Sequence, residues 1–219
     1  MMFRYALFDF DGVIADTEIS NKEFLEKALW EFGVTLTEED RRSLVGTNDP
    51  HRIERFLSRA NRPVTMEEYR AQRAISGNTY EHGNLVPMPG LISFLQFLRC
   101  KGIRTAVVSS TSLHLLRIGL ERMGMTDLFD VVIGGDMVKH RKPHPEPYQM
   151  AMEYLGAQPG ECIVFEDSPV GISAGKAAGA FVVGYTGASI QQDTSHADCL
   201  LDCFQNAYVV LGLDKTPVC

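Results

Sequence analysis

The sequence contains no uninterrupted apolar run close to the roughly 20 residues that a membrane-spanning helix requires. Its first residues also lack the basic start and apolar stretch that mark a secretory signal peptide. Internal repeats and low-complexity segments are absent as well. These absences predict a protein without a membrane partner, and we expect a cytoplasmic location.

Positive charge is also in short supply. The 21 Lys and Arg residues face 28 Asp and Glu residues, so the formal net charge is -7. A protein that binds the phosphate backbone of nucleic acid needs a basic face, so we expect no nucleic-acid partner. Small anionic ligands remain compatible with this composition, because they respond to local charge rather than to the total.

Cysteine is scarce, and the five cysteines are odd in number and scattered along the chain. Cys162 lies in the apolar stretch "CIVFED", which is typical of a reduced, buried thiol. Cys199 and Cys203 could be two metal ligands, but no partner motif lies nearby and packing is the preferred interpretation. This pattern fits a reducing cytoplasm.

What the sequence does contain is a series of short apolar runs. With 219 residues, 45% hydrophobic and 22% charged, the chain can form one large domain or one domain with a smaller insert. The central runs are apolar on both faces, as in a parallel sheet covered by helices. Helical patterns separate the later runs, so we predict an α/β fold with a Rossmann-like parallel-sheet core. The five predicted strands are "RYALFDFD", "IRTAVVSS", "FDVVIGGD", "ECIVFEDS" and "AFVVGYTG".

The first crossover departs from this alternation. Residues 16–84 contain helical patterns such as "NKEFLEKALWEFG", but no strand candidate. We therefore predict a mostly helical cap domain at residues 16–84, inserted into a core domain that is formed by residues 1–15 and 85–219. Pro87 and Pro89 suit a stiff return linker.

Polar residues gather where the predicted strands end. Asp9 and Asp11 follow the first apolar run, and alternate residues of an extended chain share a face. Two carboxylates held so close repel each other, so one takes up a proton unless a cation lies between them. In open parallel sheets, ligands bind beyond the carboxyl ends of the strands. The further polar residues expected there are Ser109, Ser110, Thr111, Lys142, Glu166, Asp167 and Ser168.

A site with four carboxylates, several hydroxyl groups and one ammonium group suits a hard cation such as Mg2+ and a phosphate substrate. The predicted chemistry is phosphoryl transfer with Mg2+ as cofactor. Asp9 can attack phosphorus, and Asp11 can protonate the leaving alcohol and then deprotonate a water molecule. Ser109 can hold phosphate oxygens, and Lys142 can supply positive charge to the transition state.

Four motifs carry these residues in order along the chain: "DFDGVI", "AVVSS", "RKPHPEPY" and "VFEDSPVGI". Together, over residues 9–168, they resemble the haloacid dehalogenase-like (HAD) phosphohydrolase superfamily. The resemblance implies a phosphoric monoester hydrolase with Asp9 as the nucleophile and Asp11 as the general acid and base. It also implies that Asp9, the backbone carbonyl of Asp11 and the pair Glu166 and Asp167 hold Mg2+.

Within this superfamily the sequence most resembles the β-phosphoglucomutase-like enzymes. Asn21 stands where the mutase has a histidine, and Val45 and Asp49 stand where its cap loop offers a lysine and an arginine. An arginine at that place would grip the second phosphate of a bisphosphate intermediate. We therefore predict a phosphatase that acts on a small phosphorylated metabolite such as a sugar phosphate. A β-phosphoglucomutase-type phosphosugar mutase is the alternative.

The cap is expected to close over the site, exclude water and select the substrate. A dehalogenase of the superfamily would need neither Asp11 nor Mg2+, and a non-catalytic binding module would be expected to have lost Asp9 or Lys142. Both alternatives are therefore disfavoured. Separately, the protein is expected to be a monomer. The candidate substrate contacts in the cap loop and below it are Gly46, Thr47, Asn48, Arg52, Ser110 and Thr111.

Several charged residues have simpler interpretations. His140 and His144 could be metal ligands or bases, but histidines on a loop surface are the preferred interpretation. Arg52, Arg55 and Arg59 fall on one helical face, which favours a solvated face.

Overall fold

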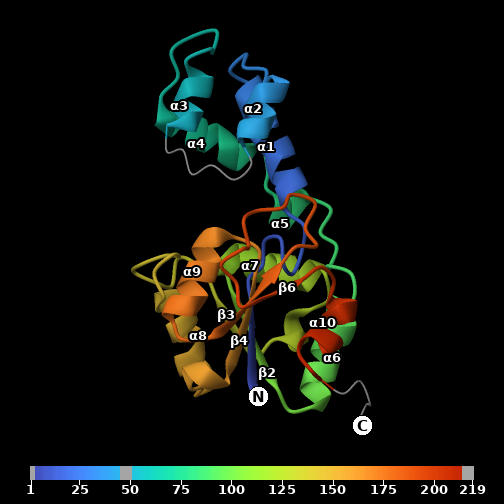
Figure 1. Ribbon diagram of the computed structural model, residues 1–219. Helices are drawn as coiled ribbons and strands as arrows, with labels where there is room; N and C mark the ends of the chain where they lie inside the picture. Colours follow the sequence, from blue (N-terminus) through green and yellow to red (C-terminus); the bar gives the residue numbers. More distant parts are fainter. Residues whose placement is uncertain (1–2, 45–50, 214–219) are drawn as a thin grey trace. The chain divides into compact units, whose positions relative to one another are not determined.

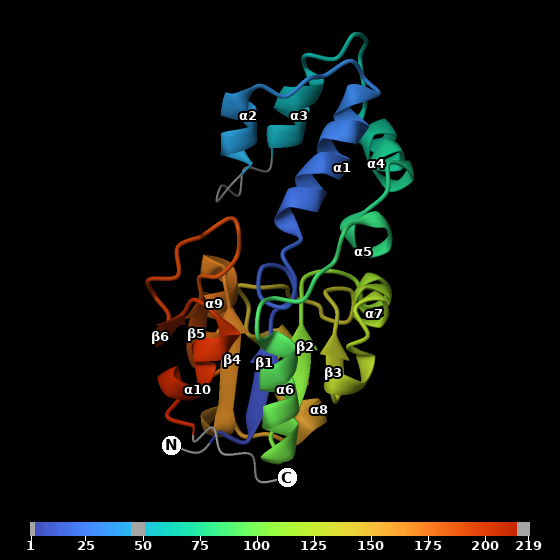
Figure 2. The same ribbon diagram turned by 90° about the vertical axis from the view of Figure 1, so that its right-hand side faces the viewer.

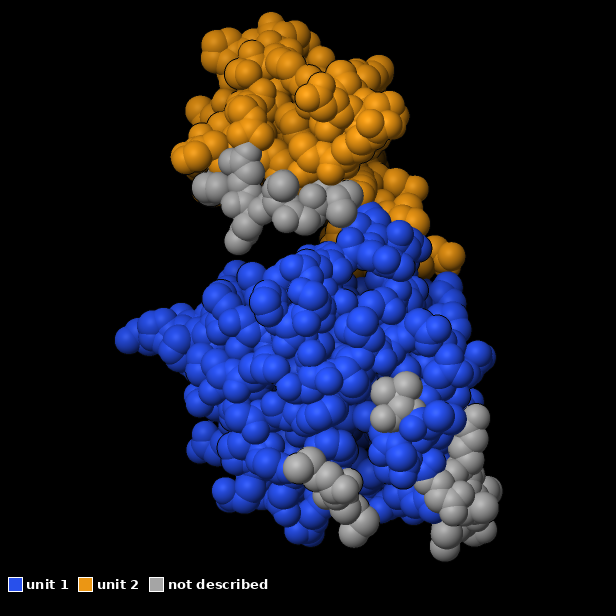
Figure 3. All heavy atoms as spheres, viewed as in Figure 1, with its two compact units in different colours: residues 1–16, 85–219 blue, residues 17–84 orange. Residues whose placement is uncertain are grey.

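The computed structural model describes residues 3–44 and 51–213. The chain divides into two compact units (Figure 3): unit 1 comprises Met1–Asp16 and Leu85–Cys219, and unit 2 comprises Thr17–Asn84. The chain leaves unit 1 soon after the first strand and returns to it at Leu85, so unit 2 is an insertion.

Unit 1 is built around a parallel sheet, which has six strands in the described part of the chain. The strand order is β3-β2-β1-β4-β5-β6, so the first strand lies inside the sheet. The predicted α/β, Rossmann-like core is thereby confirmed. The strands are β1 (Tyr5–Phe8), β2 (Arg104–Val108), β3 (Val131–Ile133), β4 (Cys162–Glu166), β5 (Phe181–Tyr185) and β6 (Cys199–Leu201).

The edge strand β6 is absent from the sequence prediction. It has three residues and pairs with β5. Leu200, at its centre, is 54% exposed. A strand this short, with a solvent-facing leucine, has neither the length nor the apolar pattern by which buried strands are recognised.

Helices cover both faces of the sheet. On one face, α8 (Glu146–Leu155) and α9 (Pro169–Ala177) share a buried core with the central strands (Figure 1). On the other face, α6 (Leu91–Cys100) and α10 (Ala207–Val210) lie over the sheet (Figure 2). The remaining helical segments of unit 1 are α7 (Leu113–Arg122) and the short 3-10 helices η1 (Thr126–Leu128), η2 (Pro159–Glu161) and η3 (Phe204–Asn206).

An aromatic cluster fixes the ends of two central strands. Phe8 of β1 and Phe165 of β4 are register partners, and their rings stack with centroids 4.7 Å apart. Phe94 and Phe204 stack on the same side, with centroids 5.7 Å apart. Each such ring pair contributes about 0.5–1.5 kcal/mol beyond the burial of its area. The residues that directly follow Phe8 and Phe165 carry two carboxylates of the candidate site.

Unit 2 is helical in its described residues, as predicted for the insert. Thr37 and Asp40 form a capping box at the start of α2 (Glu38–Ser43), and Thr65 and Glu68 form another at the start of α4 (Met66–Ile75). Caps of this kind stabilise a helix start by about 1 kcal/mol. In residues 3–44 and 51–213, no helix combines the length and apolar character that crossing a bilayer would require. The helices of unit 2 are α1 (Glu18–Trp30), α2 (Glu38–Ser43), α3 (Arg52–Leu57), α4 (Met66–Ile75) and α5 (Thr79–His82).

Candidate active site

A buried lysine lies at the centre of the site. The loop after β3 places Lys142 with its side chain only 4% exposed. Its Nζ donates hydrogen bonds to Asp9 Oδ1 at 2.8 Å, to Glu166 Oε1 at 2.6 Å and to the carbonyl of Val108 at 2.9 Å. Burial lowers the pKa of Lys142, but the attraction of Asp9 and Glu166 outweighs burial and raises that pKa above its ordinary value. Lys142 is therefore a charged ammonium group in a fixed place.

Three buried carboxylates crowd this region. Asp9, Glu166 and Asp167 each offer an oxygen, and these oxygens lie within 4.8 Å of one another. Burial, reinforced by the charge of Glu166, raises the pKa of Asp9 to about 8 even though Lys142 opposes the shift. Burial, reinforced by Asp9, raises the pKa of Asp167 to about 9. One ammonium group does not balance three carboxylates, and such a set of hard oxygen donors fits a divalent cation such as Mg2+.

The turn after β1 requires a glycine. Gly12 has a φ of +78°, in the left-handed region that residues with side chains rarely adopt. A Cβ at this position would lie 2.1 Å from Asp167 Oδ2. The turn itself is closed by a 2.8 Å hydrogen bond from Gly12 N to the carbonyl of Ala15. The missing side chain therefore lets Asp167 lie against the turn that carries Asp11.

The Asp11 side chain faces hydroxyl groups at the end of β2. Ser109 Oγ and Thr111 Oγ1 each donate to Asp11 Oδ2 over 3.4 Å. Thr111 N in turn donates to Ser109 Oγ at 3.0 Å. Ser110, between them, is exposed. Because β2 pairs directly with β1, the structure brings Ser109 and Thr111 beside the charged cluster, which consists of Lys142 and the carboxylates Asp9, Glu166 and Asp167.

Three further side chains contact the carboxylates. Tyr148 Oη donates to Glu166 Oε1 at 2.7 Å, and burial with the nearby Glu166 charge raises the pKa of Tyr148, so its hydroxyl keeps its proton. Ser168 Oγ donates to Glu166 Oε2 at 3.0 Å. Gln192 Nε2 donates to Asp167 Oδ2 at 3.3 Å. The sequence alone assigns no role to Tyr148 or Gln192. Tyr148 is the last residue of the lysine motif "RKPHPEPY", and this position could have indicated a role in the site. Gln192 lies in a loop after β5, and no sequence pattern marks it.

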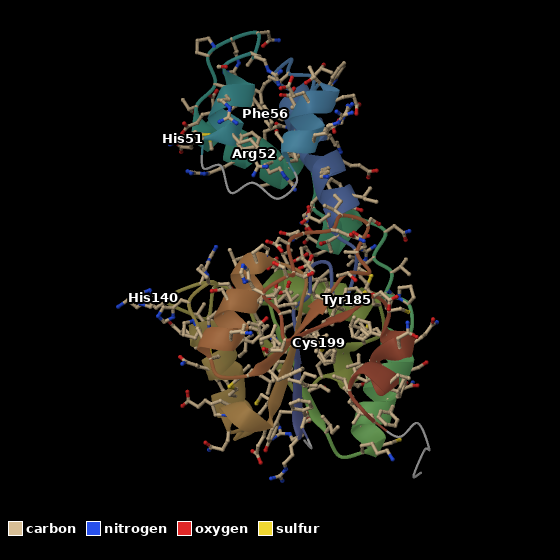
Figure 4. The ribbon with its side chains drawn as sticks, viewed as in Figure 1. His51, Arg52, Phe56, His140, Tyr185 and Cys199 are labelled. Atoms are coloured by element: carbon tan, nitrogen blue, oxygen red, sulfur yellow. The ribbon has the colours of Figure 1, made fainter. Side chains whose placement is uncertain are left out.

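The predicted contacts of the cap loop belong to unit 2. Arg52 begins α3, and its Nη1 donates to the carbonyl of Ser43 at 2.9 Å (Figure 4). Gly46, Thr47 and Asn48 lie outside the described residues, as do positions 45 and 49. A role of this segment in substrate binding stays a prediction.

The two loop histidines lie at the surface. The rings of His140 and His144 are 4.7 Å apart between centroids, and both residues are exposed. His140 points away from the sheet (Figure 4). The exposed positions of both residues agree with the interpretation that they are histidines on a loop surface.

Comparison with known proteins gives the family. A family model described as haloacid dehalogenase-like hydrolase matches residues 6–185. Pyrophosphatase PpaX of Oceanobacillus iheyensis is 32% identical over 183 residues, which are 81% of this chain and 81% of the relative. The phosphorylated carbohydrates phosphatase of Thermotoga maritima is 30% identical over 173 residues, 79% of this chain and 80% of the relative.

The solved structures agree. CbbY from Rhodobacter sphaeroides in complex with phosphate superposes with a TM-score of 0.73 at 28% identity, over 93% of this chain and 95% of the other. β-Phosphoglucomutase from Clostridium difficile superposes with a TM-score of 0.73 at 25% identity, over 96% of each chain. The α/β fold and the comparisons define a hydrolase whose relatives include named phosphatases. The chain belongs to the haloacid dehalogenase-like hydrolase family and is an enzyme of that family.

Proposed function

We propose that the protein is a Mg2+-dependent phosphatase that releases phosphate from a small phosphorylated metabolite, such as a sugar phosphate, through an aspartyl-phosphate at Asp9. The observation that carries this proposal is the buried pairing of Asp9 Oδ1 with Lys142 Nζ at 2.8 Å, beside two further carboxylates. A nucleophilic carboxylate needs nearby positive charge to approach a phosphate dianion, and this arrangement supplies part of it. The curated relatives named above are both phosphatases by name.

Asp9 acts as the nucleophile. Its carboxylate attacks phosphorus, the bond from phosphorus to the leaving oxygen breaks, and the phosphoryl group passes to the Asp9 oxygen as an acyl phosphate. Lys142 stays hydrogen-bonded to Asp9 and offsets the negative charge that builds up on the phosphoryl oxygens. When bound by Asp9, the Asp11 carbonyl, Glu166 and Asp167, Mg2+ supplies the charge that keeps the carboxylates ionised and polarises the phosphoryl group.

Asp11 acts as the general acid and base. Its protonated carboxyl gives a proton to the leaving oxygen in the first step. In the second step the same carboxylate takes a proton from water, the water oxygen attacks phosphorus, and the bond between phosphorus and Asp9 breaks. The hydroxyl groups of Ser109 and Thr111, which lie 3.4 Å from Asp11 Oδ2, can orient this carboxyl and hold phosphoryl oxygens as the substrate enters.

Unit 2 is assigned the role of a substrate-selecting cap. Its insertion directly after the turn that carries the proposed general acid supports this role. Its segment 46–48 and Arg52 are the proposed substrate contacts, together with Ser110 and Thr111 at the end of β2. The chain is proposed to act as a monomer.

A phosphosugar mutase is the second candidate, and it is favoured by the superposition on β-phosphoglucomutase. Two features weigh against it. Asn21 replaces the mutase histidine, and its Oδ1 already accepts a 2.7 Å hydrogen bond from Thr79 Oγ1 inside unit 2. In the sequence, Asp49 stands at the position where the mutase has an arginine, so a negative charge replaces the positive charge that a second phosphate would need.

The deciding experiment compares phosphate release with isomerisation. Purified protein is given β-glucose 1-phosphate, glucose 6-phosphate and a panel of phosphorylated metabolites, with Mg2+ or with EDTA. We expect Mg2+-dependent phosphate release that Asp9→Asn and Asp11→Asn abolish, while the matched surface variant Asp127→Asn retains it. Interconversion of the two glucose phosphates faster than phosphate release would favour the mutase. Turnover that persists in EDTA would contradict the phosphatase mechanism.

A further inference from the structure

The first turn of α8 and the lysine loop are tied together. Glu146, the first residue of α8, accepts hydrogen bonds from the backbone N–H groups of Lys139 at 2.7 Å and His140 at 3.0 Å. Two residues further along the helix, Tyr148 is fully buried. The loop that carries Lys142 and the helix that carries Tyr148 are therefore held as one piece.

Tyr148 contacts both members of the Lys142–Glu166 ion pair. Its Oη donates to Glu166 Oε1 at 2.7 Å, and this is the same oxygen that accepts from Lys142 Nζ at 2.6 Å. Its ring also faces the ammonium group, with Lys142 Nζ 4.9 Å from the ring centroid. A cation at this distance from an aromatic face is attracted by the ring. The hydroxyl and the ring thus act on two different charges.

Two further contacts confine the Glu166 carboxylate. Ser168 Oγ donates to Glu166 Oε2 at 3.0 Å. A Cβ at Gly171 would come within 1.8 Å of Glu166 Oε1, so the helix α9 backbone presses directly against the carboxylate. Ser168 therefore holds Oε2, the α9 backbone lies against the whole carboxylate group, and the Tyr148 hydroxyl holds Oε1, so these contacts together fix the Glu166 carboxylate.

We propose that Tyr148 is a positioning residue for phosphoryl transfer, which aims the Lys142 ammonium at Asp9 by fixing Glu166 with its hydroxyl and Lys142 with its ring. This inference rests on the proposed phosphatase function. A hydrogen bond from Tyr148 draws electron density from Glu166 Oε1 and weakens its hold on the shared ammonium. The Lys142 ammonium then interacts more strongly with Asp9. This interaction stabilises the transition state more than the substrate complex.

The test uses Tyr148→Phe, which keeps the ring and removes only the hydroxyl. We expect kcat for p-nitrophenyl phosphate with Mg2+ to fall roughly tenfold, because a hydrogen bond to a charged group is lost. KM should stay within about twofold, since the contact acts on the transition state. Tyr148→Leu, which also removes the ring, should lower kcat further. Tyr154→Phe is the matched control on the same helix, because Tyr154 is 63% exposed, and it should match wild type.

The outcomes separate this inference from the proposed function. Wild-type protein without Mg2+-dependent phosphate release would overturn the proposed function and the inference with it. An active wild type beside a Tyr148→Phe variant of unchanged kcat would overturn the inference alone. A loss of kcat that is fully explained by a smaller folded fraction, as measured by urea unfolding, would also overturn the inference. A change confined to KM would do the same. A lower kcat per folded molecule with KM preserved would support it.

Discussion

Replacing Asp9 with Asn should make the metal-free protein more stable while it abolishes activity. Asp9 is only 8% exposed and shares its surroundings with two other buried carboxylates and one ammonium group. In the folded chain, water cannot solvate an ionised Asp9 carboxylate, so this carboxyl keeps its proton to a higher pH than in the unfolded chain. Asn has nearly the same shape, carries no charge and can still accept the hydrogen bond from Lys142.

The size of the effect follows from the pKa of Asp9. This pKa is raised by burial from 3.8 to about 8 on folding. As the pH rises above 3.8, the unfolded chain releases the Asp9 proton while the folded chain keeps it, so the free energy of unfolding falls. The loss is about 1.36 kcal/mol for each pH unit, or about 4 kcal/mol at pH 7, and it levels off above pH 8. The asparagine of the variant does not titrate, so the advantage of Asp9→Asn should be near zero at pH 4, should grow with pH and should be largest from about pH 8 upward.

The assay is urea unfolding in EDTA at pH 4, 5.5 and 7, followed by circular dichroism. Asp127→Asn, at an exposed position, is the control and should follow the wild-type pH dependence. An Asp9→Asn variant that is no more stable than wild type at pH 7, or whose advantage is as large at pH 4 as at pH 7, would contradict the raised pKa of Asp9. In the same preparation, Asp9→Asn should release no phosphate from any substrate of the wild type.

Two further substitutions test other parts of the site, and a labelling experiment tests the burial of Cys162. Gly12→Ala should lower the free energy of unfolding by roughly 1–3 kcal/mol in urea titrations and abolish phosphate release, because its methyl group would lie 2.1 Å from Asp167 Oδ2 at a φ of +78°; a stable, active variant would contradict the close approach. Lys142→Met should lower kcat at least about 100-fold in the p-nitrophenyl phosphate assay, and a variant with half the wild-type rate would remove the lysine from the mechanism. Cys162 is buried, and burial raises the pKa of its thiol to about 12. Iodoacetamide at pH 8 should therefore modify Cys162 only after urea unfolding, as detected by mass spectrometry. Rapid labelling of Cys162 in the folded protein would argue against its burial.

The fold could largely be predicted from the sequence because its central strands are apolar on both faces. β4, for example, is buried at all five positions, and a short run of this kind is typical of a central strand in a covered parallel sheet. The helical insert could be predicted from the spacing of its apolar residues. The edge strand β6 could not, because its three residues depend for their conformation on pairing with β5 and carry no pattern of their own.

The charged core of the site could be predicted for a different reason. Asp9, Glu166 and Asp167 stand at strand ends, and parallel strands bring their carboxyl ends to one edge of the sheet. The contacts of Tyr148 and Gln192 depend instead on how a helix and a loop pack against that edge. No spacing along the chain determines such packing, so these contacts could be identified only from the structure.

Trapping the phosphoryl group during turnover tests directly whether an aspartyl-phosphate forms at Asp9. Wild-type protein is mixed with p-nitrophenyl phosphate and Mg2+, quenched with acid within milliseconds, digested and analysed by mass spectrometry. We expect a phosphorylated peptide with the modification on Asp9, which the Asp9→Asn variant lacks. A phosphoryl group found on another residue, or an Asp9→Asn protein that releases phosphate at the wild-type rate, would contradict it.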